Sequence, residues 1–361
     1  MHEESKPAFS FNFGAAAPTP TTTTATALQF NPVVTVPKSV SLPTTSTSTA
    51  RKEHRALFTV SGMEASSTVR PKLESPWRDV EWTAEQRTNL MKTVSSYRPS
   101  SGEVTQAQVL LLGPVGAGKS SFISSVQSVF SGRVTNRAMV GSSSSSSFTK
   151  KLQPFNILGQ KGEDPTGVVL CDIMGLSDGE MTGLTLHDVL SVIKGHVPVG
   201  HKFSPDQPVT AETEGYVRRP TLQDKIHCVA FVVDASKVLT YPKGLSSTFQ
   251  QLREHISDLG VPQLVLLTKV DEACPLVKKD VRNVYKSNNI KELMQEVSAR
   301  LGVPLSCVVP VKNYSEELEL DMNTDILLLS AIVQMLRFVD NYFDELSDRL
   351  SKVATKEVEF R

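Results

Sequence analysis

Val109-Leu-Leu-Leu112-Gly-Pro-Val-Gly-Ala-Gly-Lys-Ser120 is the stretch of sequence that decides the fold. An apolar run leads into Gly113–Ser120, which fits the pattern G-x-x-x-x-G-K-[ST] throughout, and the helical pattern Ser120–Phe130 follows. A glycine-rich turn between a strand and a helix directs backbone N–H groups and the positive end of the helix dipole at an anion. The sequence therefore predicts a phosphate-binding loop. The alternative is a plain turn in which Lys119 is solvated.

This loop is expected to hold the phosphates of a nucleotide. Lys119 would reach the β- and γ-phosphates, and the Ser120 hydroxyl would ligate Mg²⁺. Gly116 and Gly118 permit backbone angles that other residues avoid. The residues predicted to contact the nucleotide here are Gly113, Val115, Gly116, Ala117, Gly118, Lys119, Ser120 and Ser121.

Two further segments supply candidates for the magnesium site. Asp172 ends the apolar run Val168–Cys171 and begins the pattern D-x-x-G, which Gly175 completes. Asp172 would hold Mg²⁺ through water and Gly175 would let a backbone N–H approach the γ-phosphate, although a helix or turn cap is the plainer role for Asp172. Thr149, after a run of serines, is the candidate switch hydroxyl on Mg²⁺; a solvated loop in which Thr149 opens a strand fits equally well.

The base would be read by Thr268-Lys-Val-Asp271, which follows the apolar run Leu264–Leu267. A carboxylate can accept both N1–H and N2–H of guanine, a donor pair that adenine lacks, so Asp271 favours GTP and GDP. The Lys269 stem would lie along the base; the alternative is a charge pair between Lys269 and Asp271. After the next apolar run, the backbone of Lys312 or Asn313 either meets the guanine O6 or forms only a turn.

Short apolar runs alternate with amphipathic stretches over most of the chain, which predicts a doubly wound, mostly parallel α/β sheet of the P-loop NTPase, G-domain-like class. The predicted strands are Val109–Leu112, Val168–Cys171, Val229–Val233, Leu264–Leu267 and Cys307–Val309, and the predicted helices after the loop are Ser120–Phe130, Leu184–Ile193, Ser247–Leu259, Ile290–Leu301 and Ile326–Leu346. The last helix is broadly apolar, which leaves a face for self-association.

The domain organisation follows from composition. Residues 1–75 are rich in Thr, Ser and Pro and are expected to be disordered, because such a segment buries too little apolar surface to order itself. Residues 76–351 are the predicted nucleotide-binding domain, with an insertion around 177–225, and 352–361 are a C-terminal tail.

Charge and cysteine usage exclude several classes of protein. Lys and Arg number 38 and so do Asp and Glu, so no bulk positive charge favours DNA. The four cysteines form no C-x-x-C pair, and no apolar run of about 18 residues predicts a membrane span. No signal peptide is evident, so a cytoplasmic protein is expected.

Leu176 stands directly after D-x-x-G, where Ras-type GTPases place a glutamine that orients the attacking water. Leucine has no polar atom to offer there. Hydrolysis by the isolated monomer is therefore predicted to be slow, or to need dimerisation or a partner.

The run 111–122, together with Ala138-Met-Val-Gly-Ser142, Leu267-Thr-Lys-Val-Asp-Glu-Ala-Cys274 and Pro310-Val-Lys-Asn-Tyr-Ser315, resembles the interferon-induced protein 44 family. The resemblance covers residues from about 76 to about 346. It implies a cytoplasmic, interferon-inducible protein of the innate antiviral response with a GTP-binding domain. Members often carry an additional N-terminal TLDc domain, whose functions do not transfer to the Thr/Pro-rich segment here.

Three functional hypotheses remain open. The first is a Mg²⁺–GTP-binding switch or scaffold in antiviral defence, acting on protein partners that the sequence does not identify. The second is an active GTPase stimulated by oligomerisation or by a partner. The third is an interaction scaffold in which nucleotide is dispensable.

Overall fold

The computed structural model describes residues 72–135, 150–159, 164–176, 184–204 and 206–359. Thr149, the serine run before it and nearly all of the predicted N-terminal tail lie outside these residues. The description below concerns the unit that begins at Ser67.

A six-stranded sheet with the order β2-β3-β1-β4-β5-β6 forms the centre of the fold. Its strands are β1 (Ala107–Leu112), β2 (Gln153–Asn156), β3 (Val168–Asp172), β4 (Cys228–Asp234), β5 (Gln263–Thr268) and β6 (Val308–Pro310). All neighbouring strands pair in parallel except β2, which runs antiparallel to β3 at one edge. The prediction of a mostly parallel sheet is therefore confirmed.

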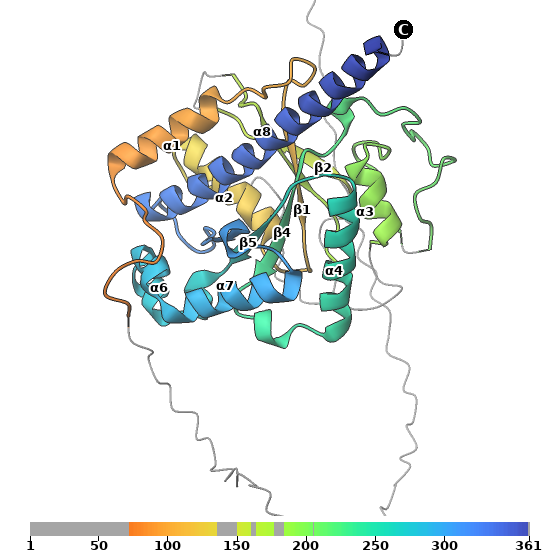
Figure 1. Cartoon of the computed structure of the whole chain (residues 1–361). Coiled ribbons are helices and arrows are strands. Elements are labelled where there is room, and N and C mark those ends of the chain that lie inside the picture. The colour runs from red at the N-terminus through yellow and green to blue at the C-terminus, as the bar shows by residue number, and fades with distance from the viewer. Residues whose placement is uncertain (1–71, 136–149, 160–163, 177–183, 205, 360–361) are drawn as a thin grey trace, which may run out of the picture. The chain divides into compact units, whose positions relative to one another are not determined.

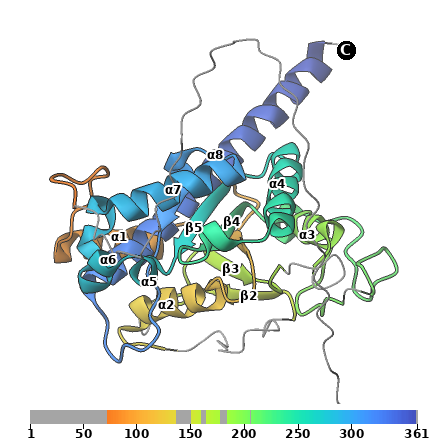
Figure 2. The same cartoon turned by 90° about the horizontal axis from the view of Figure 1, so that it is seen from below.

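The strands are apolar on both faces because helices cover both (Figures 1 and 2). In β1, Leu110 and Leu112 join one buried cluster, while Val109 and Leu111 join the other. Alternate side chains of a strand point to opposite faces, so a strand buried on both sides must be apolar throughout. This explains why the β1 run in the sequence does not alternate with polar residues.

One face of the sheet carries α3 (Leu186–Ile193), α4 (Lys243–Asp258) and α7 (Asn288–Leu301), and the other carries α1 (Ala84–Ser96), α2 (Lys119–Ser131) and most of the buried residues of α8 (Met322–Glu359). Two short helices, α5 (Val270–Ala273) and α6 (Pro275–Lys279), follow β5. Figure 1 shows α1 running beside α8. Helices on both faces of a parallel sheet make a doubly wound fold.

Local signals in the sequence set the helix boundaries. Thr83 caps α1, because its hydroxyl accepts a hydrogen bond from Gln86 N. At α3, Thr185 and Asp188 form a full capping box, in which each side chain accepts from the other residue's backbone N–H. These caps satisfy N–H groups that the first helical turn leaves unpaired.

Helix α8 is longer than the predicted Ile326–Leu346, since it runs from Met322 to Glu359. Over Met322–Lys352 its length and composition alone would allow it to cross a membrane, which the sequence did not suggest. The most apolar part of this segment is mostly buried against the sheet and α1, as a core helix is, whereas the residues after Phe343 are largely exposed, with Leu350 at 62%.

Strand β2 is the one described element of the sheet that the sequence pattern did not predict. Only Phe155 of its four residues is buried, and Pro154 lies in the middle. Proline cannot donate to a ladder and is therefore tolerated mainly on edge strands. A short strand of this kind lacks the apolar run by which the five parallel strands were predicted.

Candidate nucleotide site

The residues singled out in the sequence lie at the carboxyl ends of the parallel strands. In the sheet β1 lies between β3 and β4, so the chain places the strands that come next in the sequence on one side of β1 and the later strands on the other. Ligands of open α/β sheets bind at such a switch point, beyond the carboxyl ends of the strands. The loops after β1, β3, β4, β5 and β6 therefore form the candidate site.

The loop after β1 turns directly into α2, as the motif predicts. Gly118 is the N-cap residue of α2 and has φ 92° and ψ 21°, in the left-handed region. The backbone conformation favours glycine here, and a Cβ at this position would lie 2.9 Å from Asn313 Nδ2, so the Asn313 side chain would have to shift. The helix then begins at Lys119, with its N-terminal end facing the loop.

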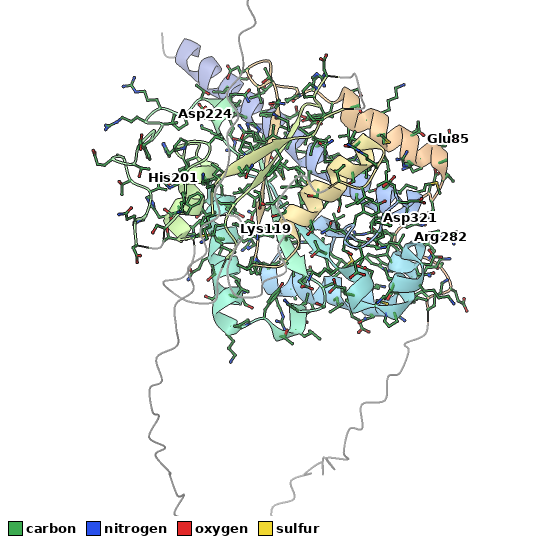
Figure 3. All side chains as sticks on the ribbon, turned by 180° about the vertical axis from the view of Figure 1, so that it is seen from behind. Glu85, Lys119, His201, Asp224, Arg282 and Asp321 are labelled. Carbon is green, nitrogen blue, oxygen red and sulfur yellow. The ribbon has the colours of Figure 1, made fainter. Side chains whose placement is uncertain are left out.

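Lys119, which is labelled in Figure 3, is buried and folds back onto its own loop. Its Nζ donates to Gly113 O and to Pro114 O, both at 2.9 Å. Burial lowers the Lys119 pKa to about 8, while the nearby Asp172 carboxylate partly opposes that shift. A buried ammonium held by two neutral carbonyls is a poorly compensated charge, so an anion placed beside it would stabilise the protonated form.

Ser120 and Asp172 meet across the ends of β1 and β3. The Ser120 hydroxyl donates to Asp172 Oδ2 at 2.6 Å, and Ile173 N donates to Asp172 Oδ1 at 3.0 Å. Asp172 is 1% exposed. A hydroxyl and a carboxylate oxygen in contact are the oxygen ligands that Mg²⁺ prefers, so this donor set fits that ion.

The segment after β3 pairs with the phosphate loop. Leu176 N donates to Gly113 O at 3.0 Å, and Val115 N donates to Leu176 O at 3.3 Å. Gly175 lies so close that a Cβ there would be 2.8 Å from Val115 N. The Leu176 side chain is buried in the apolar cluster with Ile173 and Met174, so it presents no polar atom to the site.

Thr268 connects the loop after β5 to the phosphate loop. It is fully buried, and its hydroxyl lies 2.6 Å from Ala117 O and 3.1 Å from Val233 O. A single hydroxyl proton can serve only one of these carbonyls at a time. This contact places the Thr268–Asp271 segment next to the turn that precedes Lys119.

Lys269 and Asp271 follow, and the charge pair between them, which was the alternative to a guanine site, is not formed. Lys269 has φ 56°, and its Nζ lies 3.1 Å from Asp234 Oδ2 and 3.8 Å from the exposed Glu272. Asp271 is half-buried, and within the described part of the chain its carboxylate has no recorded hydrogen bond or ion pair. An acceptor of this kind is available to a donor pair on a ligand.

The loop after β6 approaches the site through Asn313 rather than Lys312. Asn313 Nδ2 donates to Gly118 O at 3.2 Å, whereas Lys312 Nζ turns to Glu317 Oε1 at 2.8 Å. Tyr314 N donates to Ser125 Oγ in α2 at 2.8 Å, which fixes the loop against the phosphate helix. The sequence predicted a backbone contact from Lys312 or Asn313 but not this side-chain link.

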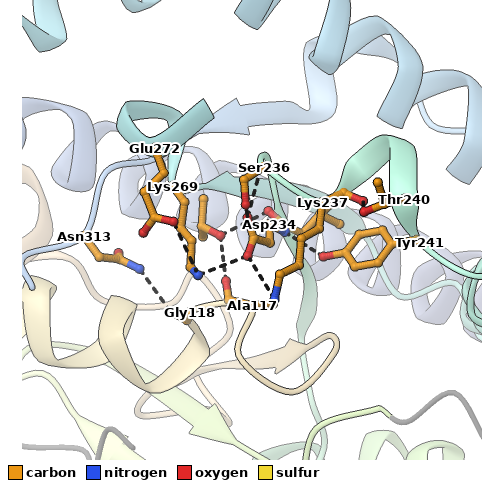
Figure 4. A network of polar contacts seen from close by, with 12 residues as sticks. Ala117, Gly118, Asp234, Ser236, Lys237, Thr240, Tyr241, Lys269, Glu272 and Asn313 are labelled. Atoms are coloured by element: carbon orange, nitrogen blue, oxygen red, sulfur yellow. Dashed lines mark hydrogen bonds and ion pairs between the residues drawn. The ribbon is translucent and has the colours of Figure 1, made fainter. Parts of the chain in front are cut away.

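Asp234, at the end of β4, is a residue of the site that sequence reasoning missed (Figure 4). Its Oδ1 accepts from Ser236 N at 3.0 Å and Ser236 Oγ at 2.6 Å, and its Oδ2 faces Lys269. Tyr241 accepts from Asp234 N at 3.0 Å. Asp234 ends the apolar run Val229–Val233 as Asp172 ends Val168–Cys171, so the same rule would have found it.

The fold thus brings together the three segments that the sequence assigned to phosphate, magnesium and base. Ser121 lies in the first turn of α2, and within the described part of the chain its side chain makes no hydrogen bond. Among the residues that the structure describes, no group of three or more His, Cys, Asp or Glu side chains forms a metal cluster. Thr149 lies outside the described residues and is not placed.

No known family model matches the chain, but several curated proteins do. Human interferon-induced protein 44-like is 36% identical over 262 residues, which is 73% of this chain and 58% of that protein. Human interferon-induced protein 44 is 35% identical over 269 residues, or 74% and 60%, and the mouse protein is 35% identical over 258 residues, or 72% and 60%. The chain therefore matches less than two thirds of the length of these relatives.

Solved structures give weaker likenesses. A probable GTP-binding protein engB is 14% identical, with 64% of this chain and 99% of that chain covered and a TM-score of 0.35. A variant of Aquifex aeolicus Era bound to GDP.AlF4- is also 14% identical, with 64% and 56% covered and a TM-score of 0.33. At these scores the likeness says nothing about what the present chain binds.

Proposed function

We propose that this chain, which belongs to the interferon-induced protein 44 family over the part it shares with those relatives, binds GTP and GDP with Mg²⁺ and acts as a nucleotide-dependent switch or scaffold. The observation that carries the proposal is that Lys119, Asp172 and Asp271 lie at or just beyond the carboxyl ends of the parallel strands β1, β3 and β5. A cation, a buried carboxylate beside a hydroxyl, and a half-buried carboxylate acceptor suit a phosphate chain, a magnesium ion and a guanine edge, respectively.

Each group has a specific task in this proposal. Lys119 exchanges its two carbonyl partners for phosphate oxygens, and the start of α2 offers backbone N–H groups to the same anion. Ser120 and Asp172 would hold Mg²⁺, which would neutralise phosphate charge. Asp271 accepts the two guanine donors, and Thr268 fixes its loop to the phosphate loop through Ala117.

Slow hydrolysis is part of the proposal. Leu176 is 3% exposed and has no side-chain atom that could orient a water molecule. Nucleotide exchange, rather than turnover in the isolated chain, would then set the state of the protein. An active GTPase would require polar groups supplied by another loop or by another subunit. We place the protein in the cytoplasm and its role in the interferon-induced antiviral response, on the basis of its family.

Asp271→Asn tests the base assignment, because the amide presents a donor where the carboxylate presents only acceptors. Xanthine carries a C2 carbonyl in place of the guanine amino group, so the variant should lose GDP binding by about 100-fold and gain xanthosine diphosphate. Titrations with fluorescent GDP, ATP and xanthosine diphosphate in Mg²⁺ measure this. Tight binding of ATP by the wild type, or unchanged GDP binding by the variant, would refute guanine recognition.

A cell assay separates the switch from a scaffold that needs no nucleotide. Lys119→Ala should abolish nucleotide binding and, for a switch, also the restriction of virus replication. Retained restriction by a variant shown to bind no nucleotide would favour the scaffold.

A further inference from the structure

We propose that Asp234 is a positioning residue for guanine recognition: its buried carboxylate holds the Lys269 side chain beside the phosphate loop before any nucleotide arrives. This inference rests on the proposed function and deepens it. Neither the motif that contains Lys269 nor the family resemblance assigns a task to Asp234.

The Asp234 carboxylate is itself fixed. It is 1% exposed, and Ser236 binds its Oδ1 through both the backbone N–H and the hydroxyl. The backbone N–H of Asp234 is held in turn by the Tyr241 hydroxyl. These contacts leave Oδ2 as the oxygen that faces the site, where it accepts no hydrogen bond of good geometry within the described part of the chain.

Lys269 is the main charge that faces Oδ2. Its Nζ lies 3.1 Å away, whereas Nζ of Lys237, on a side chain that is 56% exposed, lies 3.9 Å away. The Lys269 stem must therefore run from the end of β5 toward the end of β4, past the turn that Thr268 binds (Figure 4). Glu272 also approaches Lys269 at 3.8 Å, but it is 58% exposed, so solvent screens that pair.

The expected benefit is pre-organisation. A free lysine side chain loses much of its rotamer entropy when a ligand immobilises it, which weakens binding. An ion pair to a fixed, buried carboxylate imposes that order in the free protein, so the base meets a lysine stem that is already in place. Asp234 acts through Lys269 and does not need to touch the nucleotide.

A double-mutant cycle tests this with fluorescent GDP and Mg²⁺. Asp234→Asn should weaken binding about fivefold, since it removes the charge but keeps an oxygen for Ser236. In the Lys269→Met background the same change should have no further effect, because the side chain that Asp234 positions is gone. Glu272→Gln is the matched control, a carboxylate near the same ammonium, and should change affinity by less than about twofold.

Two results would overturn the inference: GDP binding by Asp234→Asn equal to wild type, or an equal loss in both backgrounds, which would mark a purely structural role. If Asp234→Asn does not fold, Ser236→Ala takes its place, with an expected loss of about twofold that is present with Lys269 and absent in the Lys269→Met background. Wild-type protein that binds no guanine nucleotide would refute the proposed function as well; normal wild-type binding with no coupling refutes only the role of Asp234.

Discussion

On the phosphate side of the candidate site the polar side chains bond to the protein, whereas on the base side Asp271 has no recorded partner within the described residues. Lys119 donates hydrogen bonds to two carbonyls of its own loop, and the Ser120 hydroxyl donates to Asp172. Lys269, two residues before Asp271 in the sequence, forms an ion pair with Asp234. A nucleotide would therefore have to exchange bonds on one side and could simply add them on the other.

The comparison teaches that affinity and stability need not change together. On the phosphate side a ligand must replace bonds within the protein, whereas at the half-buried Asp271 it replaces only water, so the two sides couple differently to the stability of the free protein. Substitutions on the phosphate side should therefore affect binding and stability differently.

The largest expected effect is at Lys119. Lys119→Ala should weaken fluorescent GDP binding by at least about 100-fold, because it removes charge-assisted bonds to phosphate. The midpoint of thermal unfolding should not fall in parallel, since a buried ammonium with a lowered pKa contributes little to the stability of the free protein. Lys194→Ala, at the exposed end of α3, is the control for both measurements. A large fall in the unfolding midpoint of Lys119→Ala would contradict the comparison.

A smaller effect is expected where the two sides touch. Gly118→Ala places a Cβ 2.9 Å from Asn313 Nδ2 at a φ of 92°, and should destabilise the fold by about 2 kcal/mol in urea unfolding. Gly116→Ala separates the two causes, because Gly116 has φ 75° but open space around its Cα. Gly116→Ala should lower the free energy of unfolding by about 1 kcal/mol. Equal losses in the two variants would mean that Asn313 can move aside without cost.

The smallest effect is expected at His227, which precedes β4 at the end of the strands opposite the candidate site and serves as a reference for it. His227 is fully buried; its Nδ1 accepts from Gln108 N at 2.9 Å, so Nε2 carries the proton and donates to Leu222 O at 2.9 Å. Burial lowers the His227 pKa to about 4 from 6.5. The folded state thus favours neutral histidine, and its stabilising effect is complete above pH 6.5 and is lost as the pH falls toward 4.

Between pH 7 and pH 5.5 this group should lower the free energy of unfolding by about 1 kcal/mol. His227→Gln should lack that part of the pH dependence, as measured by urea unfolding at both pH values, and its GDP affinity at pH 7 should equal that of wild type. An identical pH dependence in the two proteins would show that His227 does not titrate in this range.

The sequence predicted the five parallel strands because strands buried on both faces leave uninterrupted apolar runs, and all five were confirmed with small differences at their ends. It did not predict β2, whose Pro154 and exposed neighbours carry no such pattern. Nor did it predict the full length of α8, because the apolar residues thin out after Phe343 although the helix continues.

The sequence predicted the three motifs of the candidate site but not the contacts between them. Lys119, Asp172 and Asp271 stand in patterns that a single segment displays, so spacing alone locates them. The Asn313 bond to Gly118 and the Asp234 contact with Lys269 join residues from different strand ends, and no local pattern encodes such pairs. The roles in binding assigned to these residues stay predictions.

Among the residues that the structure describes, Lys269 is the one non-glycine with a positive φ. A lysine in that conformation costs roughly 1 kcal/mol that a glycine would avoid. Lys269→Gly would relieve that cost but would also leave the buried Asp234 carboxylate without its main cation, so the variant should not be harder to melt than wild type and should be poorer at holding nucleotide. The chain thus has an unfavourable backbone conformation at the position where the proposed function needs a long cationic side chain.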